Sequence, residues 1–156
     1  PITSFMMALT TFVSQNRGAK EYERARKGAR FGLVCSVSLA ETIGLLIALF
    51  VTPLMRLFVD DLQVIQYGVE RAHYATILFF MLAYSHGVSA VLRGVGKSVV
   101  PMVVMLVCWC LVRVTLLTML NMLFHNILFV YLIYPFTWSL SSIVFFLYYR
   151  KINWQE

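Results

Sequence analysis

Four long, nearly uncharged apolar runs place the strongest limit on how this chain of 156 residues can fold. A helix needs roughly 20 apolar residues to cross about 30 Å of hydrocarbon, and each run is close to that length. The chain is 60% hydrophobic and 13% charged, whereas soluble domains run at about 45–50% and about 25%. We therefore expect lipid to surround much of the chain. The four runs are Phe31–Thr52, Tyr74–Leu92, Met102–Leu123 and Ile127–Tyr149.

A fifth apolar run, Pro1–Val13, is too short to cross a bilayer. We interpret it as the end of a helix whose first half precedes this sequence. The prediction is an all-α, polytopic helical membrane protein with four full transmembrane helices plus the end of a fifth, in a single transmembrane bundle. The expected helices cover residues 1–16, 31–52, 74–92, 99–123 and 127–149 of the bundle over residues 1–156.

Lysine and arginine residues fall mainly in the connections between these runs, and their number alternates. Ten lie in the first connection, the third connection and the C-terminal tail, whereas the second connection holds Arg56 and Arg71. The positive-inside rule then predicts a cytoplasmic C-terminus. Because the basic residues do not form one hydrophilic face, the net charge of +6 does not indicate nucleic-acid binding. The ten are Arg17, Lys20, Arg24, Arg26, Lys27, Arg30, Arg93, Lys97, Arg150 and Lys151.

The first connection carries a dense basic stretch, Glu21–Arg30. It could lie along the membrane as a surface helix, where each basic residue gains about 1 kcal/mol near anionic lipid. It could also be a solvated loop that fixes the topology. The two interpretations are compatible, and both keep this stretch outside the hydrocarbon.

No arrangement of catalytic or metal-ligating residues is apparent. Gly94–Ser98 is similar to the end of a phosphate-binding loop, but Val91 stands where that motif needs its first glycine. We expect a helix end capped by glycine instead. Cys35, Cys108 and Cys110 lie inside apolar runs and have no metal-ligand spacing. The expectation is a protein that is not an enzyme and holds no metal or organic cofactor.

Glu41 and Arg113 are the charges deepest within the expected helices. Such a charge costs roughly 2.5–3.5 kcal/mol on insertion scales, so each should face protein or water. At 1.5 Å per residue, Glu41 lies about 15 Å and Arg113 about 16–17 Å from the same membrane face. The matching depths suggest an ion pair between two helices, and separate partners for the two charges are an equal alternative.

Tyr84, Ser85 and His86 bring polar groups into the second full run. They could form a cavity wall that touches substrate or carries a proton. They could instead hydrogen-bond between helices, which is the commoner use of such residues in membrane bundles. Arg93 and Lys97 follow at the end of the same run, where we expect them to anchor the helix at the cytoplasmic headgroups.

Three groups of residues, in order along the chain, carry a resemblance to a known family. Ala8–Ala19 with Tyr22–Ala25 resembles the end of the eighth helix of multidrug and toxic compound extrusion (MATE) transporters. Leu92–Ser98 resembles the link between their tenth and eleventh helices. Tyr134–Trp138 and Tyr148–Lys151 resemble their last helix. The chain is similar to these transporters over nearly its whole length.

The resemblance implies twelve helices in two lobes, with this chain forming part of the C-terminal lobe. It implies an antiporter in the cell membrane that exports cationic drugs or metabolites in exchange for Na+ or H+ by alternating access. The implied partners are membrane lipids, the N-terminal lobe of the same transporter and cationic small molecules. Tyr84, His86 and Trp138 are then the expected substrate-cavity residues. The run Tyr74–Leu92 has no Asp or Glu, so Glu41 is the membrane-embedded acid that the sequence offers for coupling.

Two other functions are compatible with the same sequence. A flippase for lipid-linked oligosaccharides, from the same superfamily, should line its cavity with several cations, and Arg113 is the one deep cation here. A membrane-embedded assembly subunit would carry out no transport. Efflux of a cationic dye under an ion gradient is the observation that distinguishes the antiporter from both.

Overall fold

The structure is a computed structural model that describes residues 2–124 and 127–154. Within these residues every regular element is a helix, which confirms the all-α prediction. Two of the helices that the sequence predicts to be continuous are interrupted, one by a break between α3 and α4 and the other by a π-helical segment. The elements are α1 (Ile2–Gly18), α2 (Tyr22–Arg56), α3 (Leu62–Thr76), α4 (Phe79–Gly94), α5 (Val99–Met105), the π-helix η1 (Leu106–Val112), α6 (Arg113–Phe124) and α7 (Ile127–Arg150).

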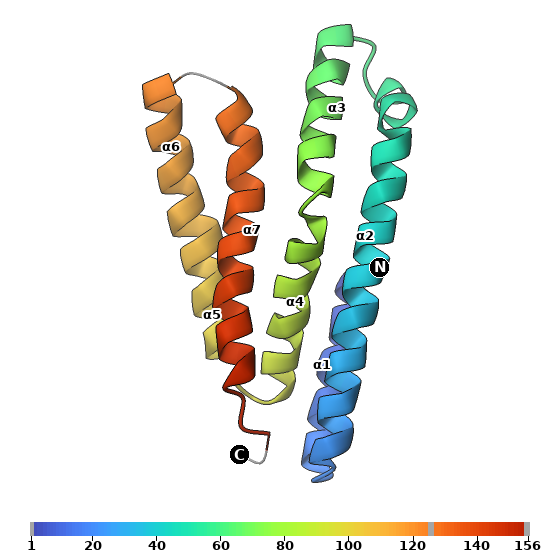
Figure 1. Ribbon diagram of the computed structural model, residues 1–156, viewed down its shortest axis with the longest axis vertical. Coiled ribbons are helices and arrows are strands. Elements are labelled where there is room, and N and C mark those ends of the chain that lie inside the picture. The colour runs from blue at the N-terminus through green and yellow to red at the C-terminus, as the bar shows by residue number, and fades with distance from the viewer. Residues whose placement is uncertain (1, 125–126, 155–156) are drawn as a thin grey trace.

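The helices form an elongated bundle in which α4 is the central element (Figure 1). It packs against α1, α2 and α7, and the segment α5–η1–α6 packs mainly on α7 at one edge. The α1–α2 turn, the α4–α5 turn and the C-terminal end of α7 lie at the same end of the bundle (Figure 1). Val13, Leu92 and Phe145 are fully buried where α1, α4 and α7 meet. The three basic segments identified in the sequence are therefore neighbours in space.

Large apolar side chains cover the outside of this bundle. Among the described residues, three helices are long and apolar enough to cross a membrane: α2, the run from Val99 to Leu123, and the run from Leu128 to Arg150. The pair α3–α4 forms a fourth such span, bent by 56°. Outward-facing residues such as Leu49 and Met122 are 74% and 73% exposed. Since a soluble surface rarely carries so much contiguous apolar area, the chain is a multi-pass membrane protein.

The basic stretch Glu21–Arg30 is neither a surface helix nor a loop. Helix α1 continues to Gly18, the turn takes three residues, and α2 begins at Tyr22 and runs for 35 residues. Ala25 and Ala29 are fully buried, and the side chain of Phe12 occupies the space over Gly28. This close packing of α1 on α2 holds the stretch in helical form. Because 35 residues span about 52 Å, the basic start of α2 extends beyond the hydrocarbon.

The second connection, expected over residues 53–73, also contains a helix. Helix α2 passes through Pro53 to Arg56, and α3 begins after Asp61. The Asp61 carboxylate accepts hydrogen bonds from the backbone N–H of Gln63 at 2.8 Å and of Val64 at 3.4 Å, which is an N-cap. The connection is therefore a short turn, and α3 packs against α2 and α7.

Candidate functional site

A cavity of about 500 Å³ lies between α1 and α4. Its volume is within the range of about 300–1,000 Å³ that is usual for small-molecule sites. Its walls combine thioethers, hydroxyls, one imidazole and one guanidinium. The lining residues are Thr3, Met6, Met7, Thr10 and Thr11 of α1, and Leu82, His86 and Arg93 of α4.

Small residues on α4 allow α1 to approach closely enough to close one side of this cavity. The Thr10 hydroxyl donates to the backbone carbonyl of Ala90 at 3.1 Å, which ties the two helices together. A Cβ added at Gly94 would lie 2.9 Å from the Thr10 carbonyl oxygen and 2.8 Å from the Val13 Cβ. The backbones are therefore near their closest approach just beside the cavity.

His86 occupies the wall between this cavity and the π-helix η1. Its ring meets Trp109 edge to face, with 5.2 Å between ring centroids. The Trp109 indole N–H donates to the Ser141 hydroxyl at 3.2 Å, so α7 in turn holds the tryptophan. The imidazole is thus supported on one side by an aromatic ring and faces the cavity on the other.

Arg93 lies at the end of the cavity nearest the basic end of the bundle. Its guanidinium donates to the Ser89 hydroxyl and lines the cavity, in addition to the anchoring role expected from the sequence. Lys97 follows in the α4–α5 turn, where its backbone N–H donates to the Leu92 carbonyl at 2.9 Å. Gly96 in that turn has φ +79, so the predicted glycine cap of the helix end is confirmed.

Arg17 is a contact residue that the sequence interpretation missed. It was counted only as a topological charge, yet its guanidinium donates to the Val95 carbonyl. This bond connects the end of α1 to the α4–α5 turn, beside Gly96. Its position directly before Gly18, at a helix end, is the one signal that could have suggested a role in binding a carbonyl.

Tyr84, Ser85 and His86 of α4 do not share one role: Ser85 hydrogen-bonds between helices, whereas Tyr84 and His86 line cavities. The Ser85 hydroxyl lies 3.0 Å from the Ser141 hydroxyl and 2.8 Å from that of Ser142, so it links α4 to α7 within the membrane. His86 lines the α1–α4 cavity. Tyr84 faces a separate apolar cavity of about 280 Å³ between α2 and α7.

Trp138, the third residue expected in the substrate cavity, is 8% exposed. It packs edge to face on Phe79 of α4 and on Tyr134 of its own helix, with centroid distances of 6.2 Å and 6.4 Å. The structure therefore does not bring Tyr84, His86 and Trp138 together. Of the three, His86 lines the α1–α4 cavity, and a substrate contact by Trp138 stays a prediction.

The suggested ion pair between Glu41 and Arg113 does not form. Arg113 donates from Nη2 and Nε to the Thr137 hydroxyl at 2.6 Å and 3.1 Å, and its guanidinium lies 4.6 Å from the centre of the Tyr134 ring. One carboxylate oxygen of Glu41 is buried without a hydrogen-bond partner in the described part of the chain. The physical reason is lateral position, because α2 and α6 lie on opposite sides of α4 and α7 (Figure 1).

Comparison with known proteins identifies the family. The MatE family model matches residues 1–119, which include every residue of the α1–α4 cavity. The chain belongs to the MatE family. The resemblance found in the sequence is thereby confirmed. This MatE chain is also 30% identical over 104 residues to the "Probable multidrug resistance protein NorM" of Thermotoga maritima.

That alignment covers 67% of this MatE chain and 22% of the relative, so the chain spans about a fifth of the relative's length. Among residues 2–124 and 127–154 no three His, Cys, Asp or Glu side chains cluster as metal ligands would. What the site offers chemically is a mixed apolar and hydroxyl surface with one cationic end. A surface of this kind is suited to contact with amphipathic molecules.

Proposed function

We propose that this chain forms part of a secondary antiporter that exports cationic, amphipathic drugs or metabolites in exchange for Na+ or H+. The observation that carries the proposal is the MatE match over residues 1–119. The relative from Thermotoga maritima is named as a probable multidrug resistance protein, which agrees with the proposal. The protein acts by binding and translocation and is not an enzyme.

The α1–α4 cavity is the proposed substrate contact of this chain. Met6 and Met7 supply flexible, polarisable thioethers that adapt to ligands of different shape. Thr10 and Thr11 supply hydroxyls that can accept a hydrogen bond from a protonated amine. Because Arg93 would repel a cation, the charged group of the substrate should bind away from it, near the start of α1.

Alternating access requires a second lobe that rocks against the one described here. The N-terminal lobe of the same transporter is therefore the proposed protein partner, and membrane lipids surround both. The cluster of basic turns at one end of the bundle supports a cytoplasmic C-terminus in the cell membrane. In that orientation Arg93 and Lys97 lie at the cytoplasmic end of α4.

Glu41 is the proposed contribution of this chain to coupling. One of its carboxylate oxygens is buried inside the bundle and makes no hydrogen bond to another described residue. A proton or a bound Na+ would neutralise the charge of this carboxylate and so remove the free-energy cost of a charge within the membrane. Protonation or Na+ binding at Glu41 would thus be sensed by α2 and, through packing, by α4.

A lipid-linked oligosaccharide flippase is the second candidate, and one observation favours it. Arg71 of α3 stacks on Tyr134, with 5.1 Å from its guanidinium carbon to the ring centre, and Arg113 stacks on the same ring. The bundle thus holds two neighbouring cations where the sequence suggested one. Both residues lie outside the α1–α4 cavity, which is why the antiporter remains the preferred function.

The full-length protein reconstituted in vesicles tests this proposal. Ethidium efflux that starts when a Na+ or H+ gradient is applied supports the antiporter. Movement of a lipid-linked sugar, with no ethidium efflux under either gradient, supports the flippase instead. Absence of both activities in folded protein would leave the assembly subunit and contradict the proposal.

Two histidine variants locate the substrate contact. His86→Ala should raise the half-saturating ethidium concentration several-fold, because it removes part of the cavity wall. His73→Ala is the matched control, since His73 is exposed and bonds only the Val69 carbonyl of its own helix. An equal effect of both substitutions would exclude the α1–α4 cavity as the binding site.

A further inference from the structure

A second cavity system lies where α2 begins and α7 ends. One hollow of about 310 Å³ is lined by residues of α2, α7 and the C-terminal segment, and a neighbouring one of the same volume shares three of them. The shared residues are Arg26, Arg30 and Trp154, so the two hollows adjoin, and together they are here called the basic hollow. The remaining lining residues are Tyr149, Arg150 and Ile152 on one side, and Tyr22, Glu23 and Lys27 on the other.

The basic hollow carries an excess of positive charge. Its one acid, Glu23, pairs with Lys27 at 3.5 Å, one turn along α2. In the described parts of the chain, Arg26, Arg30 and Arg150 form no ion pair with a carboxylate. Three guanidinium groups around one small space repel one another unless an anion lies between them. The arrangement therefore has the charge of a site for an anionic group.

A buried hydroxyl points to the same conclusion. The Tyr149 hydroxyl is buried with Arg30 beside it, and because a guanidinium can only donate, the hydroxyl proton has no acceptor among the described residues. Burying a hydroxyl without a partner is costly, so such a group usually has a ligand or water to bind. This donor faces the same hollow as the three arginines.

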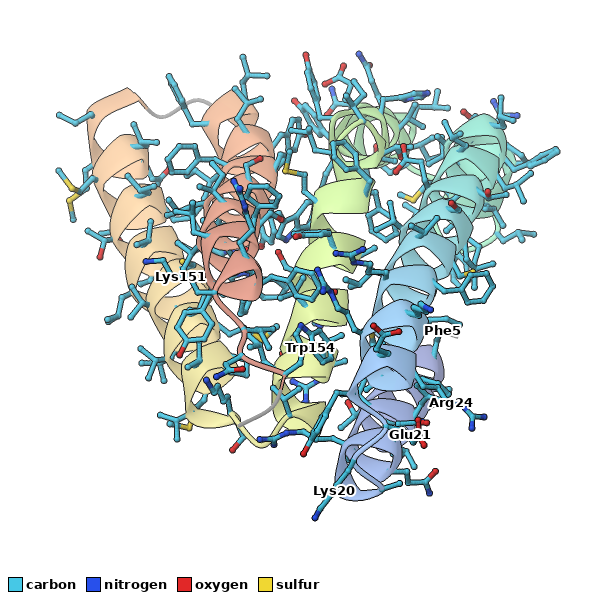
Figure 2. All side chains as sticks on the ribbon, turned by 60° about the horizontal axis from the view of Figure 1, so that its bottom comes forward. Phe5, Lys20, Glu21, Arg24, Lys151 and Trp154 are labelled. Atoms are coloured by element: carbon cyan, nitrogen blue, oxygen red, sulfur yellow. The ribbon has the colours of Figure 1, made fainter. Side chains whose placement is uncertain are left out.

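The C-terminal segment gives the hollow a fixed wall. Trp154 meets Tyr149 edge to face at 6.3 Å, and Ile152 is 8% exposed within the core. Figure 2 shows Trp154 between the end of α7 and α2, whereas Arg24 lies on the far side of α2, Lys20 lies at the tip of the α1–α2 turn and Lys151 lies on the other side of α7. Tertiary packing therefore builds the floor of the hollow, and the three exposed arginines lie around it.

A separate apolar groove lies deeper in the membrane, between the same two helices α2 and α7. The cavity of about 280 Å³ that Tyr84 faces has no polar surface and is lined by Val37 of α2 and Phe146 and Ile143 of α7. Along α2, Val37 lies seven residues, or about 10 Å, deeper than Arg30. Phe146 lies directly below Arg150, whose guanidinium carbon is 5.8 Å from the ring centre. A charged space and an apolar one thus follow each other along α2 and α7, at a distance that one lipid molecule can bridge.

We propose that this composite site binds one anionic phospholipid, with its phosphate in the basic hollow and an acyl chain in the apolar groove. Arginine pairs with phosphate oxygens through two parallel hydrogen bonds, and tyrosine and tryptophan favour the headgroup level. The hollow lies at the basic end of the bundle, where α2 extends beyond the hydrocarbon. Basic pockets between transmembrane helices on that side are suited to anionic headgroups. A free phosphate would use the hollow but not the groove.

Native mass spectrometry of the full-length protein in detergent tests the proposal. We expect one dioleoylphosphatidylglycerol to remain bound under conditions that remove dioleoylphosphatidylcholine. The double substitution Arg26→Gln, Arg30→Gln should weaken phosphatidylglycerol binding about tenfold or more, because it removes two charge-assisted contacts. Lys20→Gln, Arg24→Gln is the matched control, since it removes the same charge from two exposed residues that do not line the hollow.

Two further arms distinguish the lipid from free phosphate. Ile143→Trp should fill the groove and weaken binding of the dioleoyl lipid while leaving dihexanoylphosphatidylglycerol unaffected, and Ile143 is 57% exposed, so the fold should tolerate it. Inorganic phosphate at millimolar concentration should not displace the lipid. Displacement by phosphate, equal loss in the control pair or no preference over phosphatidylcholine would each overturn the proposal. None of these readouts depends on transport, so the proposed function can fail independently.

Discussion

Gly96 has a backbone conformation that glycine adopts readily and that residues with a Cβ rarely adopt. Its φ of +79 lies in the left-handed region, and it ends α4 with the Gly96 N–H donating to Arg93 and the Lys97 N–H to Leu92. This pair of backbone hydrogen bonds is the Schellman motif, in which a glycine commonly ends the helix. The turn also receives the Arg17 side chain on the Val95 carbonyl. One small residue thus fixes how α1, α4 and α5 meet.

Gly96→Ala should therefore destabilise the protein by about 1–2 kcal/mol, the usual cost of a left-handed conformation for a residue with a Cβ. The added Cβ would also lie 3.4 Å from Arg17 Nη1. Thermal unfolding in detergent, followed by tryptophan fluorescence, measures the change. Gly18→Ala is the control, because nothing lies within 4 Å of a Cβ there and its φ is not positive. Equal stability of the two variants would contradict the argument.

Ser85 is the centre of the polar contacts within the membrane. Its hydroxyl reaches Ser141 and Ser142, and Ser142 donates to the Met81 carbonyl at 2.8 Å. Hydrogen bonds of this kind contribute about 0.6 kcal/mol on average in membrane bundles and rarely more than about 1.7. Ser85→Ala should cost an amount in this range. A double-mutant cycle with Ser141→Ala measures the coupling, and strict additivity would mean that the two hydroxyls do not interact.

At the scale of helices, the sequence predicts which segments form long apolar helices, but it does not predict where those helices are interrupted. Each long run became a helix because lipid leaves backbone groups no other partner. The break between α3 and α4 falls at Ile77 and Leu78, where the sequence has no glycine or proline that would predict a break. The π-helix Leu106–Val112 likewise has neither residue. Both depend on what the neighbouring helices require, which a single run does not contain.

The same limit explains which features of the candidate site the sequence predicts and which it does not. Depth along a helix follows from residue number, so Glu41 and Arg113 could be placed at similar levels. Which helices are neighbours is a property of the whole bundle, so their pairing could not be predicted. His86 was recognised because an imidazole in an apolar run is conspicuous. Met6 and Thr10 were not singled out as a site, because such residues are ordinary in membrane helices.

Helices α1 and α4 approach each other closely at Gly94. Among the described glycines, Gly94 is the one whose nearest neighbours include a backbone atom of another helix. A methyl group at Gly94 would meet the Thr10 carbonyl oxygen at 2.9 Å, and backbone cannot move aside as a flexible side chain can. Gly94→Ala should therefore cost about 1–3 kcal/mol through overpacking and separate α1 from α4. Gly68→Ala is the control, since the nearest atoms belong to the flexible Met55 side chain.

The separation should also alter the α1–α4 cavity. In the reconstituted protein, Gly94→Ala is expected to change ethidium affinity as well as stability, whereas Gly68→Ala should leave ethidium affinity unchanged because α2 and α3 do not line that cavity. Unaltered unfolding and binding in the Gly94 variant would mean that the two helices have room to separate, and that the cavity does not depend on their spacing.

For the whole molecule, the distribution of charge predicts which end of the bundle faces the cytoplasm. The turn containing Lys20, the α4–α5 turn and Lys151 lie together at one end, and the turn containing Asp60 lies at the other (Figure 1). Because the bent pair α3–α4 acts as one span, the break inside it does not change the side on which later turns emerge. The positive-inside rule assigns the basic end to the cytoplasm.

Single cysteines introduced into a variant without Cys35, Cys108 and Cys110 test this orientation. Asp60→Cys should react with a membrane-impermeant maleimide in intact cells, since Asp60 is exposed at the acidic end. Lys20→Cys and Lys151→Cys, also at exposed positions, should react only after the cells are permeabilised. The opposite pattern would place the basic hollow on the outer face of the membrane. The assignment of sides, which depends on counting charges, would then be wrong, whereas the residues proposed to hold the lipid would keep their arrangement.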